Sequence, residues 1–164
     1  MFAELFNFKA KSNREILAGL VKSGLEASHA DGMTAIRTMN HTWVVDQIFK
    51  AHLTGTGHGY DAANTPQTPD LGELCAKIEE TDAWFIDYAT SLTPEQLQER
   101  IDFSFTDGKR GSMTREEILL HVITHGTYHR GAVGLILLRS GVTPPAETFT
   151  RYLHEAQPER RAAR

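Results

Sequence analysis

The sequence has a single cysteine, no excess of positive charge and no long apolar run. Cys75 has no partner for a disulfide within the chain. The formal net charge of −4 at pH 7 argues against an intrinsic nucleic-acid-binding protein, whose surface would be basic. No apolar stretch could span a bilayer, and residues 1–8 contain an acid but no base, unlike a signal peptide. We therefore expect a cytoplasmic protein that contacts neither nucleic acid nor membrane.

Amphipathic periodicity is the dominant pattern in the 164 residues, which are enough for one domain with a proper core. Apolar residues recur at three- and four-residue spacing in four long stretches. The first stretch has an imperfect register around Lys9 to Arg14. Alternating apolar residues before Asp107-Gly108 predict a β-hairpin. The expected elements are long helices over residues 4–25, 32–53, 69–91 and 114–140, short helices near 93–97 and 148–155, and a hairpin over 100–111.

Four long amphipathic helices in a short chain predict an all-α four-helix bundle. We expect a crossover connection and a small β-hairpin before the last long helix, and the long loop that holds this hairpin is the expected crossover. Residues 1–156 should form a single domain. Residues 157–164 are charged and are expected to be a disordered tail.

Three histidines, His121, His125 and His129, follow one another at four-residue spacing and so share one face of the last long helix. The apolar register around them places His125 and His129 toward the core, and His41 lies on the inward stripe of the second helix. One buried histidine is usually only hydrogen-bonded, whereas two on successive turns more often share a metal ion. We therefore predict a metal held by His41, His125 and His129.

The chemistry of this predicted site follows from its ligands. Three protein nitrogens with an open fourth position are typical of a catalytic zinc site, and imidazole also suits nickel, iron and cobalt. The pattern is not the zincin motif, because no glutamate follows His121. His121 is interpreted as a residue that lines or supports the site. Asp46 and Glu117 are candidate acceptors for the outer N–H groups of the ligands.

The remaining histidines and one arginine receive simpler interpretations. Arg130 is expected to point outward and form a salt bridge. Four histidines have no inward partner at helical spacing and are interpreted as surface residues: His29, His52, His58 and His154.

Several segments together resemble the DinB family of YfiT-like metalloenzymes, over nearly the whole chain. They are Asn40-His41 through Asp46, His125-x-x-x-His129-Arg130-Gly131, Pro144-Pro145, and Arg151-Tyr-Leu-His154. The resemblance implies a four-helix bundle with a crossover, a homodimer, and a metal held by the residues that match here, His41, His125 and His129. Ala132 departs from the family pattern, which usually has glutamine there.

Function is less constrained than the site. The resemblance implies a metal-dependent enzyme, either a thiol S-transferase that acts on a small molecule with a low-molecular-weight thiol, or a hydrolase. Zinc or nickel is the expected metal, ahead of iron or cobalt, and no catalytic residue is assigned. Two alternatives stay open: a non-catalytic metal-binding or stress-response module, and a structural bundle whose histidines bind nothing.

Overall fold

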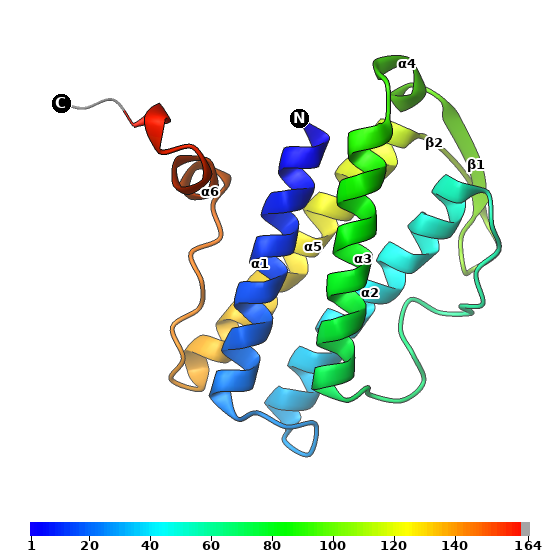
Figure 1. Ribbon diagram of the computed structural model, residues 1–164. Helices are drawn as coiled ribbons and strands as arrows, with labels where there is room; N and C mark the ends of the chain where they lie inside the picture. Colours follow the sequence, from blue (N-terminus) through cyan, green and yellow to red (C-terminus); the bar gives the residue numbers. More distant parts are fainter. Residues whose placement is uncertain (162–164) are drawn as a thin grey trace.

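The computed structural model describes residues 1–161 and contains a bundle of four long helices (Figure 1). The long helices are α1 (Phe2–Ser23), α2 (Ala30–Thr54), α3 (Leu71–Ser91) and α5 (Arg115–Arg139). Each lies close to its predicted range. The short helix α4 (Pro94–Leu97) and a two-stranded antiparallel sheet separate α3 from α5. The predicted fold class, an all-α bundle with a small hairpin before the last long helix, is confirmed.

The helix starts follow their capping residues. Thr114 and Glu117 form a capping box at the start of α5: the Thr114 hydroxyl accepts a hydrogen bond from the Glu117 amide, and the Glu117 carboxylate accepts one from the Thr114 amide. Asp70 caps α3 by accepting a hydrogen bond from the Glu73 amide at 3.0 Å. Helix α3 therefore begins after Asp70, two residues later than predicted.

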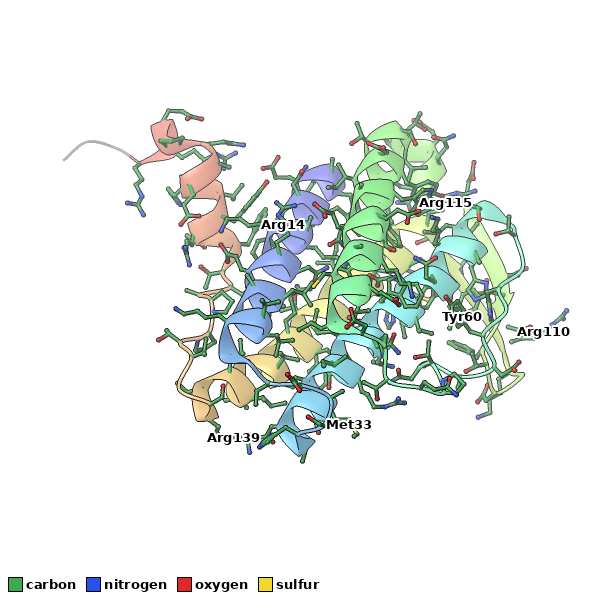
Figure 2. All side chains as sticks on the ribbon, turned by 60° about the horizontal axis from the view of Figure 1, so that its bottom comes forward. Arg14, Met33, Tyr60, Arg110, Arg115 and Arg139 are labelled. Carbon is green, nitrogen blue, oxygen red and sulfur yellow. The ribbon has the colours of Figure 1, made fainter. Side chains whose placement is uncertain are left out.

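The packing order of the helices differs from their order in the chain. Helix α1 packs against α3 and α5, and α2 packs against the same two helices, so α1 and α2 lie on a diagonal of the bundle. Helices α2 and α3 start at the same end and run in the same direction (Figure 1). Figure 2 shows Met33 of α2 near Arg139 of α5 and Arg115 at the opposite end, so these two helices are antiparallel.

The crossover was therefore predicted in the wrong loop. The segment of residues 55–70 connects two parallel helices and must run the length of the bundle (Figure 1). The segment of residues 92–114 joins the end of α3 to the start of α5 at the same end, so it only reverses the chain direction. Its length accommodates α4 and the hairpin and is not needed to cross the bundle.

The hairpin lies over the last turns of α2 and the first turns of α5. Strands β1 (Arg100–Ser104) and β2 (Arg110–Thr114) pair antiparallel, and the second strand extends three residues beyond the predicted end. Phe103 of β1 faces Gly111 of β2, where a Cβ atom would lie 2.8 Å from the Phe103 ring. The same ring packs edge-on against Phe49 of α2, with centroids 5.8 Å apart. The hairpin thus covers one side of the bundle beside α2.

Two apolar clusters fill the bundle, one toward each end. The first includes Leu20, Met39, Leu74 and Leu137, and the second includes Phe6, Phe85, Ile118 and Val122. Between the two clusters, the four helices also bury several polar or ionisable side chains: Lys9, Asn13, Asn40, Asp46, Asp82 and Arg130. A polar layer in the middle of a bundle core is costly unless its groups are paired, so it marks a place to look for function.

The chain after α5 returns along α1. Helix α6 (Phe149–Ala156) is held by ring contacts of Phe149 and Tyr152 with Phe8, at centroid distances of 5.5 and 5.6 Å. Within the predicted tail of residues 157–164, Pro158–Arg160 form one 3-10 turn, and residues 162–164 lie outside the described residues. Across residues 1–161, no helix is long and apolar enough to cross a membrane.

Candidate metal centre

The structure brings His41, His125 and His129 together, and we call them the histidine cluster. One ring nitrogen from each residue lies within 4.8 Å of those of the other two. The Nε2 atoms of His41 and His125 are 3.0 Å apart. Two nitrogens bound to one zinc ion at about 2.1 Å with a tetrahedral angle lie roughly 3.4 Å apart. The distance between His41 and His125 is therefore close to that of two ligands of one metal ion, and the nitrogen of His129 lies nearby.

A backbone carbonyl fixes the orientation of His41. Its Nδ1 lies 2.6 Å from the carbonyl oxygen of Ala63, in the crossover segment. Because a carbonyl oxygen can only accept, Nδ1 carries the proton and Nε2 presents its lone pair to the other two rings. This is the arrangement found in metal-binding histidines, where an outer hydrogen bond sets the tautomer of the ligand.

A hydrogen bond alone does not account for all three rings. His125 can donate from Nε2 to His41, which leaves its buried Nδ1 without a partner among the described residues. His129 has no hydrogen bond from its ring to any described residue, although it packs edge-on against both other rings at centroid distances of 4.7 and 4.5 Å. A metal ion would also use a nitrogen of His129, which the hydrogen-bonded pair leaves out, so the residues present fit a metal better than a hydrogen-bonded pair.

His125 and His129 are held in the neutral form that metal binding requires. Burial, followed by the neighbouring His129 and His41 rings, lowers the pKa of His125 to about 3. Burial and His41 also lower the pKa of His129. At neutral pH these two imidazoles are therefore unprotonated, and each has a lone pair available for a metal ion.

Behind the cluster lies a chain of ion pairs and hydrogen bonds that we call the buried charge network. Lys9 contacts Asp46 at 2.7 Å and Asp82 at 2.6 Å, and all three side chains are almost fully buried. Asn13 donates to Asp82 at 2.8 Å and accepts from Arg130 at 2.9 Å. The network therefore joins α1, α2, α3 and α5 at the level of the histidines.

The network continues from Arg130 to the segment after α5. Arg130 is 2% exposed and donates from Nε and Nη2 to the two carboxylate oxygens of Glu147, at 2.8 and 2.6 Å. This is the bidentate geometry that makes arginine–carboxylate pairs strong. The predicted salt bridge of Arg130 is confirmed, but its predicted outward orientation is wrong. Successive residues of an α-helix are rotated by about 100°, so the residue after His129 faces α1. There Asn13 of α1 and Glu147 from the segment after α5 supply the acceptors.

The two candidate acceptors for the outer N–H groups of the ligands have other partners. Asp46 faces Lys9 instead of a histidine, and Glu117 is used in the capping box of α5. The outer partner of His41 is the Ala63 carbonyl, which sequence inspection could not indicate because every residue has a carbonyl. Burial, together with the nearby Asp82 carboxylate, raises the pKa of the Asp46 carboxyl to about 6 despite its contact with Lys9.

A pocket of about 340 Å³ opens beside the histidine cluster, between α2, α5 and the hairpin, and we call it the hairpin pocket. It shares His125 with the cluster, it is also lined by Ala63, whose carbonyl holds His41, and His121 lines it as predicted. His121 stacks on His125 at a centroid distance of 5.3 Å but is not among the three converging histidines. The interpretation of His52 as a surface residue is wrong: it is half-buried in the pocket wall and stacks on Phe103 at 4.7 Å.

The cluster contains no fourth protein ligand. Among residues 1–161, the group of histidine, cysteine and acidic side chains that converge here is limited to the three histidines. A structural zinc site is normally closed by a fourth ligand, whereas a catalytic site keeps a position for water or substrate. The arrangement is therefore suited to bind a metal ion with a position left for a small molecule.

The fold and the site define a helical bundle with a three-histidine centre between two helices. The model of the DinB family matches residues 1–161, and the chain belongs to this family. Among solved structures, the chain is similar to the crystal structure of a DinB-like protein from Bacillus cereus ATCC 10987, at 16% identity and a TM-score of 0.65. The match covers 88% of this chain and 94% of that one, and it supports the fold. A comparison with curated proteins finds no match.

Proposed function

We propose that the protein binds one divalent transition metal through His41, His125 and His129 and acts as a metal-dependent enzyme. The observation that carries this proposal is the convergence of three imidazoles with no fourth protein ligand among the described residues, beside a pocket that shares His125. Zinc or nickel is the expected metal, ahead of iron or cobalt, and all four accept imidazole nitrogen. A bound metal would lower the pKa of a coordinated thiol or water.

The reaction that we favour is transfer of a small thiol to an electrophile. Its support is the thiol-dependent chemistry that the resemblance to the DinB family implies, together with a pocket large enough for an electrophile beside the cluster. Hydrolysis by a metal-bound water is the alternative, since the same open position can take water. Assembly into a homodimer is likewise a proposal from family membership.

The first test is the metal content of the protein, purified without a histidine tag. We expect close to one transition-metal ion per chain by elemental analysis, and loss of this metal in His129→Ala. His154→Ala is the matched control, because His154 lies on α6 and its ring contacts the Thr150 carbonyl. His121→Phe should also keep its metal. Wild-type protein that holds no metal, even after reconstitution with each candidate, contradicts the proposal.

A second measurement separates the two reactions. Metal-loaded protein is mixed with an uncharged aryl halide and a panel of small thiols, and in parallel with an uncharged aryl ester without thiol. Thiol-dependent release of halide that disappears in His129→Ala supports the transferase. Ester cleavage that needs the metal and no thiol supports the hydrolase. Stoichiometric metal without either activity favours a non-catalytic metal-binding module.

A further inference from the structure

The hairpin pocket has walls that specify what can enter it. One wall is aromatic: Phe49 of α2 packs on His121 at a centroid distance of 4.9 Å, and Phe103 packs on Phe105 at 5.1 Å. Aliphatic side chains complete the lining: Val45, Ile48 and Met113. Flat rings that face a cavity favour a ligand ring, by offset or edge-to-face packing.

The pocket is also without formal charge. No lysine, arginine, aspartate or glutamate is among the described residues that line it. The imidazole of His52 is held neutral because burial, followed by His58, lowers its pKa. An anionic or cationic group placed here would lose its hydration without gaining a counter-charge, so the pocket selects against charged groups.

A few polar atoms remain to orient a ligand. The rings of His52 and His121 make no hydrogen bond to another described residue, and Thr106 lines the rim. A ligand with one neutral polar atom can therefore be hydrogen-bonded while its ring stays in the apolar part. The volume of about 340 Å³ lies at the small end of ligand pockets, which suits one or two rings.

We propose that the hairpin pocket binds an uncharged, ring-bearing part of the substrate and presents its reactive atom to the histidine cluster. The inference rests on the proposed function, since it places the electrophile of that reaction. Residues of the hairpin and α2 then determine which substrates bind. Charge excludes phosphates and amino acids from this pocket, and the many hydroxyl groups of a sugar would find too few partners there. Small aromatic electrophiles are favoured.

The probe is 2-naphthol, which is neutral at pH 7, titrated by calorimetry into metal-loaded protein. Two variants alter the pocket at hairpin residues that are half-exposed, so the fold should stay intact. Phe105→Ser removes an aromatic ring from the pocket wall, and Met113→Trp fills part of the pocket. Leu135→Ser is the control, because Leu135 is exposed on α5 outside the pocket. We expect binding roughly tenfold weaker in both pocket variants and unchanged in the control.

The charge requirement is tested with naphthalene-2-sulfonate, which has the same rings and a weakly coordinating anionic group. We expect it to bind at least about tenfold more weakly than 2-naphthol. The inference is overturned if 2-naphthol does not bind, if both pocket variants bind it like the wild type, or if the sulfonate binds equally well. Elemental analysis of each sample keeps the two proposals separate. If the protein holds metal but does not bind 2-naphthol, only the proposal about the hairpin pocket is overturned. If it binds 2-naphthol but takes up no metal, only the proposed function is overturned.

Discussion

Lys9 is the residue on which the polar layer of the core depends. Its ammonium group is 1% exposed and lies between the carboxylates of Asp46 and Asp82, one from each of two other helices. Each carboxylate has been removed from water, and the attraction to Lys9 offsets that cost. Burial tends to lower the pKa of Lys9, but the two carboxylates outweigh it and raise the pKa above its usual value. Lys9 therefore stays charged.

Replacing Lys9 by methionine should destabilise the protein strongly. Lys9→Met keeps the volume but leaves two buried carboxylates without a counter-charge, which costs about 3–5 kcal/mol. Lys11→Met is the matched control on the same helix: Lys11 pairs with Glu15 and Glu155 at the surface, where an ion pair contributes about 0–1 kcal/mol. The measurement is the free energy of unfolding in urea. Equal losses in the two variants contradict the assigned role of Lys9.

Helix α5 begins at a capping box, carries two residues of the histidine cluster, and packs closely against the buried charge network. Gly126 follows His125 and lies against the buried charge network. A Cβ at this position would come within 2.8 Å of Arg130 Nη1 and 3.6 Å of Lys9 Cε. The Arg130 side chain cannot move aside easily, because Asn13, Thr127 and Glu147 all hold its guanidinium. Gly126 therefore makes room for the network at the level of the histidines.

Two glycine substitutions on this helix should have opposite effects. Glycine inside a helix normally costs about 1 kcal/mol relative to alanine, so Gly131→Ala, which meets nothing within 4 Å, should stabilise the protein by about 0.5–1 kcal/mol. Gly126→Ala should instead destabilise it by about 1–3 kcal/mol through overpacking. Urea unfolding of both variants provides the measurement. If Gly126→Ala is as stabilising as Gly131→Ala, the network does not require the close approach.

Features that depend on neighbours in the chain could be predicted from the sequence, and contacts between helices could not. Periodicity and capping boxes depend on neighbours in the chain, so the four helices and the inward faces of His41, His125 and His129 were predictable. The buried charge network depends on contacts between helices. Its only local sign was the imperfect register of the first helix, where Lys9 and Asn13 continue the inward stripe of Phe6 and Ile16.

Other parts of the site had no local sign. The course of the crossover depends on which helices pack together, and loop length alone pointed to the wrong segment. The Ala63 carbonyl and the place of His52 in the hairpin pocket depend on how residues 55–70 and the hairpin lie over α2. The metal ligands themselves are still a prediction, because convergence of the histidine cluster is a geometric finding.

At the scale of the whole molecule, the segment after α5 closes the buried charge network from outside. It crosses the surface beside α1, and Glu147 from this segment supplies both acceptors for Nε and Nη2 of the buried Arg130. Further along, Phe149 and Tyr152 of α6 pack on Phe8. The segment therefore adds little apolar core but neutralises a charge that the four long helices leave without a carboxylate.

Two truncations should distinguish the contribution of Glu147 to stability from that of residues 157–164. Deleting residues 157–164 leaves α6 and Glu147 in place and should change the free energy of unfolding by less than about 0.5 kcal/mol. Deleting residues 147–164 removes two charge-assisted hydrogen bonds to Arg130, each contributing about 1.5–3 kcal/mol, and partial hydration of the uncovered guanidinium offsets some of the loss. We expect a net loss of at least about 2 kcal/mol in urea unfolding.

The comparison is informative because Arg130 directly follows His129. If the longer truncation loses stability and also weakens metal binding, the segment supports the histidine cluster through Arg130. If it loses stability while metal binding stays the same, the contribution of Glu147 is confined to the network. A longer truncation as stable as the shorter one contradicts the closure of the network by Glu147, because a buried guanidinium does not lose a bidentate carboxylate without cost.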